Sequence, residues 1–199
     1  MGQYYHPFLI GEHGKYHIIN PHHYNNGLKL MEHSYIGNYV TNAVRTLIVE
    51  RPMRVAWIGD YSDAPYTDAY SGKLPFEKFM RYYKACWSGT PKYVHPLEFD
   101  YDETRQGWYL VNHTQKCFID MDAYNTASGY TESGYFTIVD PLPLLTACGN
   151  DRGGGDFHEW CVGYKDVGIW AFDMIGFTSI NPGEWGYEKK EFRFMERSE

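Results

Sequence analysis

The chain has 199 residues and a formal net charge of −7, and 43% of its residues are hydrophobic. These values are typical of a globular protein with a sizeable core, and we expect one domain over residues 1–199. The acidic balance disfavours a nucleic-acid polymer as the main partner, because proteins that follow a phosphate backbone usually carry a basic surface. The sequence lacks an apolar run of about 18 residues and a secretory signal. We therefore expect no membrane partner and a cytoplasmic protein.

Aromatic residues make up 18% of the chain, with 19 tyrosines and 6 tryptophans. Tyrosine combines an apolar ring with a polar tip, so it suits half-buried walls, grooves and interfaces. The simplest explanation is a β-rich fold that buries many rings. The four cysteines show no CxxC pair and no zinc-ribbon spacing, which favours reduced thiols. The alternative is a disulfide between Cys148 and Cys161 that would staple the loop between them.

The first half of the chain predicts a hairpin, a helix and a strand. Residues 4–10 and 15–20 are strand-like runs around a glycine-bounded turn. From Ser34, apolar residues recur with helical spacing as far as Ile48, and Pro52 closes the helix. Its opposite face is polar but only lightly charged; that face carries Asn38, Thr41, Asn42 and Arg45. Residues 54–60 then predict a short buried strand.

The second half predicts one more helix and several short strands. Pro75 can open a helix whose apolar face includes Phe79 and Met80. Hairpin or strand patterns follow at 108–120, 135–140, 167–177 and 190–195, with a short helical turn in 141–148. Strands outnumber helices and are joined mostly by hairpins. The expected fold is α+β: an antiparallel sheet built from hairpins, with the two main helices packed on one face.

The segment GNDRGGGDFHEW, at 149–160, has three consecutive glycines. Residues without a Cβ adopt positive φ freely, so the amides of Gly153, Gly154 and Gly155 can converge on an anion. Arg152 adds a fork of donors for a phosphate or carboxylate. The segment matches no standard phosphate-binding motif. A surface turn that crosses close over another segment explains the glycines equally well.

Four aspartates suggest a second chemistry. Asp60 and Asp63 follow the strand at 54–60, and Asp151 and Asp156 flank the glycines. Together they can form a two-metal site of the phosphodiesterase type, in which divalent cations clamp the attacking and leaving oxygens. Each aspartate also has a simpler explanation as a turn or cap residue. No other cofactor is expected.

Histidines are crowded at the start of the chain. Six of them occupy the first 33 residues: His6, His13, His17, His22, His23 and His33. Imidazole is a common ligand of transition metals, and His6 and His17 lie on the two strands of the first predicted hairpin. No recognised zinc spacing accompanies them, so scattered surface histidines are the simpler interpretation. No activated serine or cysteine signature is present.

Four stretches together resemble a family of uncharacterised bacterial and phage proteins. They are the opening MGQYY, NGLKLMEHSYIGN at 26–38, GDYSD at 59–63, and PLLTACGNDRGGGD at 143–156. The resemblance spans most of the chain but brings no established activity and therefore no catalytic residue. For the phage members, it implies a role as a counter-defence factor. The chain departs from the family pattern at Cys148 and Asp151.

These patterns favour a non-catalytic binder of a small anionic, nucleotide-like molecule, such as a signal of host immunity. Aromatic rings would stack on a flat base while cations and backbone amides hold the anionic part. The expected ligand-binding residues are Lys29, Arg152, Gly153, Gly154, Gly155 and Trp160. The alternative is a metal-assisted phosphoester hydrolase that uses the four aspartates. A further alternative is an inhibitor that binds a host defence protein through aromatic residues, and a homo-oligomer stays open.

Overall fold

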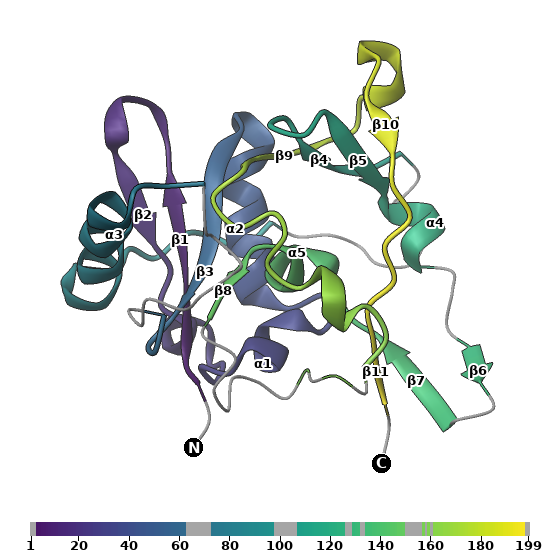
Figure 1. Ribbon diagram of the computed structural model, residues 1–199, viewed down its shortest axis with the longest axis horizontal. Helices are drawn as coiled ribbons and strands as arrows, with labels where there is room; N and C mark the ends of the chain where they lie inside the picture. Colours follow the sequence, from purple (N-terminus) through teal and green to yellow (C-terminus); the bar gives the residue numbers. More distant parts are fainter. Residues whose placement is uncertain are drawn as a thin grey trace.

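The computed structural model of the chain describes residues 3–62, 73–97, 107–125, 129–131, 134–149, 157, 159 and 161–197. Its main sheet has eight strands, seven of them in the order β10-β5-β4-β9-β3-β1-β2, with β8 added beside β3 (Figure 1). These strands are β1 (Tyr5–Ile10), β2 (Tyr16–Ile18), β3 (Met53–Gly59), β4 (Tyr109–Asn112), β5 (Cys117–Asp120), β8 (Ala147–Cys148), β9 (Met174–Thr178) and β10 (Glu188–Lys189). A smaller sheet joins β6 (Gly129–Thr131), β7 (Gly134–Ile138) and β11 (Met195–Arg197).

Within the described residues, five helices accompany the sheets. They are α1 (Leu30–Ser34), α2 (Tyr39–Glu50), α3 (Phe76–Ser88), α4 (Met121–Asn125) and α5 (Pro141–Leu145), with short 3₁₀ turns η1 (Glu12–Gly14), η2 (Pro21–Tyr24), η4 (Tyr164–Asp166) and η5 (Pro182–Trp185). Most strand pairs are antiparallel, so the predicted α+β class and the hairpins β1–β2 and β4–β5 are confirmed. No helix within the described ranges has the length and apolar character that crossing a membrane requires.

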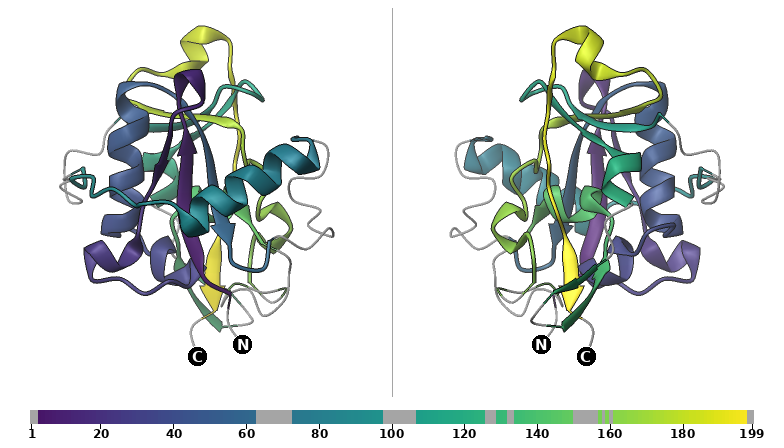
Figure 2. Two further views of the ribbon diagram at one scale, coloured as in Figure 1. Left: turned by 90° about the vertical axis from the view of Figure 1, so that its left-hand side faces the viewer. Right: turned by 90° about the vertical axis from the view of Figure 1, so that its right-hand side faces the viewer.

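The two main helices lie on opposite faces of the sheet, and not on one face as predicted. Along β1, Leu9 faces the cluster that contains α2, whereas Phe8 faces the cluster that contains α3. In β3, Trp57 and Ile58 divide in the same way. Figures 1 and 2 together show α3 on one side of β1 and β3 and α2 on the other. Both strands are apolar at consecutive positions, and this pattern indicates burial on both faces.

The face of α2 that is polar in sequence is almost fully buried. Thr41, Asn42 and Arg45 are each at most 3% exposed. The Thr41 hydroxyl donates to the carbonyl of His33 at 2.6 Å, and the Arg45 guanidinium pairs with the carboxylate of Asp140 at 2.5 Å. Buried polar groups are tolerated when each has a hydrogen-bond partner. The polar face of α2 is therefore buried as well as its apolar face, and the helix packs on β9, α1 and η2.

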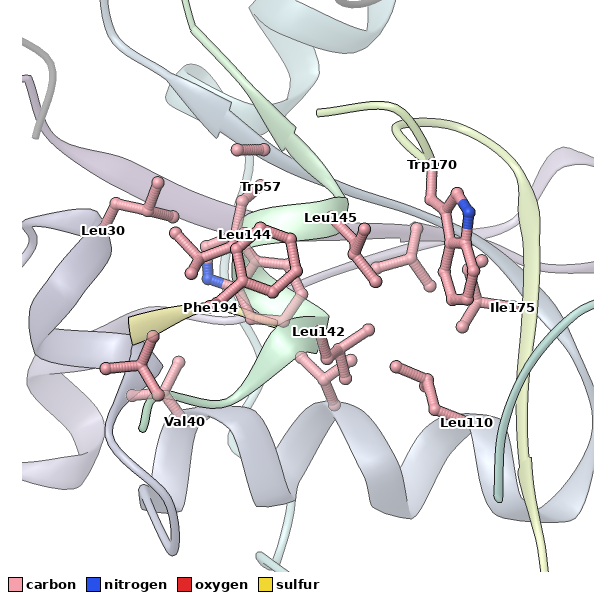
Figure 3. Packing of buried hydrophobic residues seen from close by; sticks show 14 of the residues in the cluster. Leu30, Val40, Trp57, Leu110, Leu142, Leu144, Leu145, Trp170, Ile175 and Phe194 are labelled. Carbon is pink, nitrogen blue, oxygen red and sulfur yellow. The ribbon is translucent and has the colours of Figure 1, made fainter. Parts of the chain in front are cut away.

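Short helix α5 fills the core between β3 and α2 (Figure 3). Its leucines Leu142, Leu144 and Leu145 are all 0% exposed. Pro141 opens it, and the carboxylate of Asp140 accepts a hydrogen bond from the Leu142 N–H at 3.0 Å. The helix ends at Leu145 with Thr146 as its C-cap, and β8 follows directly. The helical turn predicted in 141–148 therefore covers only the first five of these residues.

The pairing of Arg45 with Asp140 should dominate any mutational scan of α2. Asp140→Asn removes the buried carboxylate that pairs with the buried Arg45 guanidinium, so we expect a loss of about 3–5 kcal/mol in the free energy of unfolding. Urea denaturation measures this loss. The matched control is Glu12→Gln, because the Glu12–Arg51 pair is separated by 3.9 Å and is more than half exposed. That change should alter stability by less than about 0.5 kcal/mol. Equal losses in the two variants would contradict the prediction.

Candidate functional site

The stretches that characterise the sequence converge at one edge of the main sheet. Strands β3 and β8 run parallel, with Trp57 opposite Ala147 and Ile58 opposite Cys148. Parallel strands end at the same edge, so the segments that begin with Asp60 and with Gly149 leave the sheet side by side. Strand β1 is antiparallel to β3 and begins at this edge, with Tyr5 opposite Gly59 (Figure 1). We call this edge the strand-end site.

Tyr4 joins the predicted residues Lys29 and Asp60. Its backbone N–H donates to the Asp60 carboxylate at 3.1 Å, and its carbonyl accepts the Asp60 N–H at 2.9 Å. On its other side, Tyr4 forms an isolated antiparallel bridge with Lys29. The next residue continues this contact, because the Tyr5 N–H donates to the Leu28 carbonyl at 2.7 Å. The structure therefore brings Lys29 and Asp60 to the two sides of one residue.

Gln3 lies at the centre of the site and is 0% exposed. Its Oε1 accepts the hydroxyl of Tyr5 at 2.7 Å. Its Nε2 is buried and has no hydrogen-bond partner within the described part of the chain. The great majority of buried polar groups are paired, so this donor needs an explanation.

Glycine is required at both strand ends because Gln3 and Tyr5 occupy the space of a side chain. A Cβ on Gly59 would lie 2.4 Å from Gln3 Nε2. A Cβ on Gly149 would lie 2.4 Å from the Tyr5 hydroxyl oxygen and 2.7 Å from Gln3 Oε1. The Gln3 amide is therefore held directly between the ends of β3 and β8.

Hydrogen bonds from other elements fix the end of β3. The Ser62 hydroxyl donates to the Gly59 carbonyl at 2.6 Å, and the Tyr83 hydroxyl on α3 donates to the Asp60 carbonyl at 2.7 Å. Beside this fixed backbone, the rings of Tyr4 and Tyr61 are 47% and 38% exposed. The site thus combines a rigid polar backbone with two accessible aromatic rings.

A buried histidine supports the segment that carries Lys29. His33 is 0% exposed; its Nε2 donates to the Gly27 carbonyl at 2.9 Å, and its Nδ1 accepts the Trp57 indole N–H at 3.2 Å. These partners require the neutral ring with its proton on Nε2. Burial lowers the pKa of His33 from 6.5 to about 4, so the ring is neutral at physiological pH.

Most of the predicted site residues lie outside the described residues. They are Asp63, Asp151, Arg152, Gly153, Gly154, Gly155, Asp156 and Trp160. Gly149, the described residue that leads into their segment, lies at the strand-end site. Of the four aspartates predicted to bind metal, only Asp60 is a described residue, and its Oδ1 accepts the Tyr4 N–H.

The described residues hold no group of three histidine, cysteine, aspartate or glutamate side chains placed to bind a metal. His6 and His17 do not meet as the first hairpin suggested, because His17 lies opposite Leu9 and the His6 ring stacks on Trp87 at 4.5 Å. Burial lowers the pKa of His6 to about 4. All four cysteines are free and buried, so the alternative of a bridge between Cys148 and Cys161 is wrong.

Sequence reasoning did not identify Gln3, Tyr5 or Gly59 as site residues. The available signals were the opening MGQYY, which contains Gln3 and Tyr5, and GDYSD at 59–63, which begins with Gly59. Both entered as marks of resemblance without a role. No known protein family, curated protein or solved structure matches the chain. The geometry of the site is therefore the basis for any functional inference.

The close approach of Gln3 to Gly59 gives a testable prediction about stability. Gly59→Ala should destabilise the protein by about 1–3 kcal/mol, because the added methyl group overlaps the Gln3 amide. Adding Gln3→Ala removes the overlap, so the double variant should lose less stability than the two single variants together, with a coupling of about 1 kcal/mol. Thermal and urea unfolding measure all three variants.

Gly11→Ala is the control, because the nearest atom to its added Cβ is 3.6 Å away. It should change stability by less than about 1 kcal/mol, the usual range for glycine in a compatible backbone. Strict additivity between Gly59→Ala and Gln3→Ala would show that the two residues do not compete for the same space.

The buried His33 gives a prediction about the pH dependence of the free energy of unfolding. Between pH 6.5 and pH 4 the unfolded chain protonates this residue and the folded chain does not. The free energy of unfolding should therefore fall as the pH drops through this window, by about 3 kcal/mol from His33 alone. Urea unfolding at pH 7 and pH 4.5 should show a smaller difference for His33→Gln than for the wild-type protein. If His33→Gln shows the same difference between the two pH values as the wild-type protein, the prediction is wrong. The control is His23→Gln, at an exposed position.

Proposed function

We propose that the protein binds a small anionic, nucleotide-like molecule at the strand-end site without transforming it. A ligand in open sheets commonly lies beyond the carboxyl ends of adjacent parallel strands, where loops diverge. Strands β3 and β8 provide such ends, and the segments with Asp60 and Gly149 start there. The resemblance to phage proteins extends the proposal to sequestration of a nucleotide signal of host immunity.

The buried Nε2 of Gln3 is the observation that carries this proposal. Leaving a buried amide donor without an acceptor costs about 1–3 kcal/mol of stability. A phosphate oxygen or a carbonyl of a base would accept this hydrogen and recover the loss. The donor lies beside Gly59, where a side chain would have excluded it. We infer that the site keeps this group for a ligand that presents an acceptor atom.

Neighbouring groups suit the other parts of a nucleotide. Lys29 lies beside Tyr4 and supplies a cation for a phosphate, while the exposed rings of Tyr4 and Tyr61 offer faces on which a base can stack. In this proposal Arg152 and the amides of Gly153, Gly154 and Gly155 add the anion-holding group that the sequence predicts.

Binding is favoured over metal-assisted hydrolysis because of the position of Asp60. Its Oδ1 accepts the backbone N–H of Tyr4, and its own N–H donates to the Tyr4 carbonyl. This reciprocal pair gives the carboxylate a structural task in holding the start of β1. A metal ligand at this position would have to break or share that hydrogen bond.

A panel of nucleotides tests the proposed function by thermal shift. We expect at least one anionic nucleotide to raise the melting temperature without added divalent metal, and its uncharged nucleoside to have a smaller effect. Gln3→Met keeps the side chain's length but removes the Nε2 donor, together with the oxygen that accepts the Tyr5 hydroxyl. It should weaken binding by about tenfold or more, the value of one hydrogen bond to a charged group. Lys29→Gln should weaken binding too, whereas Lys84→Gln on α3 should not.

Recovery of the bound molecule separates the two chemistries. A binder releases its ligand unchanged after heat denaturation, and EDTA leaves its affinity unaltered. Formation of product that stops in EDTA would replace binding by hydrolysis. A complete lack of response across the panel, with and without magnesium or manganese, would favour inhibition of a protein partner instead.

A further inference from the structure

A second hollow lies far from the strand-end residues in sequence, between α4 and the last segment of the chain. Its volume is about 100 Å³, several times the space needed for one water molecule. One wall comes from the end of β5 and from α4; the other comes from residues 189–193. We call residues 190–194 the C-terminal strap and the hollow the strap pocket. In Figure 1 the strap runs past α4 on its way from β10 to β11.

The backbone of the strap is hydrogen-bonded at both ends but not in the middle, where the Phe192 ring packs against Trp170 with ring centroids 5.5 Å apart. At its start, the Lys190 N–H donates to the Phe118 carbonyl at 2.8 Å. At its end, the Phe194 N–H donates to the Tyr124 hydroxyl at 3.2 Å, and the Val139 N–H donates to the Phe194 carbonyl at 3.2 Å. Glu191 to Arg193 make no backbone hydrogen bond to the described residues. In the middle of the strap, the backbone is therefore not paired with β5.

The floor of the strap pocket is apolar and fixed. Ile119, Tyr124 and Phe192 contribute to its lining, and the first two are at most 8% exposed. The Tyr124 hydroxyl also donates to the Val139 carbonyl at 2.6 Å, which turns its polar tip toward the backbone. Burial raises the pKa of Tyr124, so the phenol stays neutral. Two aromatic rings and an aliphatic side chain suit an apolar ring as the guest.

One cation of the lining has no partner within the described residues, and that is Arg193. Lys189 pairs with Asp120 at 2.8 Å, and Lys190 pairs with Glu188 at 2.7 Å. The hydrogen bonds to these carboxylates raise the pKa of both lysines. Arg193 is exposed and makes no side-chain hydrogen bond or ion pair there. Its guanidinium is therefore the group available to an incoming anion.

The charges around the pocket select the anion. Guanidinium matches a planar carboxylate with two parallel hydrogen bonds. A phosphate dianion would leave one charge unmatched near Asp120 and Glu191, both of which line the pocket. From this geometry we propose that the strap pocket binds a small aromatic carboxylate, with Arg193 holding the carboxylate and Tyr124 and Phe192 contacting the ring. This site is independent of the nucleotide proposal.

NMR titration with benzoate tests the strap pocket in the intact protein. We expect benzoate to shift the backbone amide signals of residues 190–193, while the signals of Tyr4 and Tyr5 report separately on the strand-end site. Benzamide, which has the same ring without the charge, should bind more weakly. Arg193→Gln should weaken benzoate binding by about tenfold, as the loss of one charge-assisted contact predicts.

Arg81→Gln is the matched control, because Arg81 is an exposed arginine on α3, away from the strap. Its benzoate affinity should equal that of the wild-type protein. Equal affinity for benzamide and benzoate, unchanged affinity in Arg193→Gln, or preferential binding of inorganic phosphate at the strap would each overturn the proposal. Both substitutions are at exposed positions, so a native amide spectrum elsewhere in the protein confirms that each variant is folded.

Discussion

The parallel pairing of β8 with β3 is the constraint on which the strand-end site depends. One edge of β3 is shared: Met53 and Arg54 pair with β9, and Trp57 and Ile58 pair with β8. Trp57 stands where the partner changes, with its backbone N–H on the Thr146 carbonyl and its indole N–H on His33. Through these two hydrogen bonds, Trp57 connects β3 both to the start of β8 and to α1, the helix that follows Lys29. Without this connection, Gly149 and Asp60 would leave the sheet at unrelated places.

At the strand-end site, stability and the proposed binding make opposite demands on Gln3. A fully buried glutamine whose Nε2 donor has no acceptor among the described residues is unfavourable for stability. The Gln3 side chain nevertheless packs closely against its neighbours. Because Gly59 and Gly149 have no Cβ, the side chains of Gln3 and Tyr5 occupy the space beside them. The Oε1 of Gln3 has a structural role, because it accepts the Tyr5 hydroxyl, but its Nε2 donor has no such role among the described residues. A buried donor that is retained in a closely packed position breaks a local rule of stability, and such exceptions are expected at functional sites.

Local patterns predicted the elements better than their arrangement. The helices α2 and α3 and the hairpins were evident, because periodicity and turn residues are encoded within a few positions. Strand β8 has two residues and no pattern of its own, so the parallel pairing that forms the site was not predictable. The partner of Arg45 is Asp140, 95 positions away, which is why a buried polar face of α2 could not be inferred. For the same reason Gln3 had no signal, since its importance arises only from the two glycines that surround it.

The chain has a net charge of −7, yet we propose an anion as the ligand of both sites. Net charge acts through long distances, and at physiological ionic strength such interactions are screened beyond about 8 Å. It therefore disfavours a polyanion, which must satisfy many contacts over an extended surface. A small anion depends on the few donors that touch it, such as Gln3 Nε2 and Lys29 at one site and Arg193 at the other. Donors that are already oriented by the fold hold such a ligand without a basic surface around them.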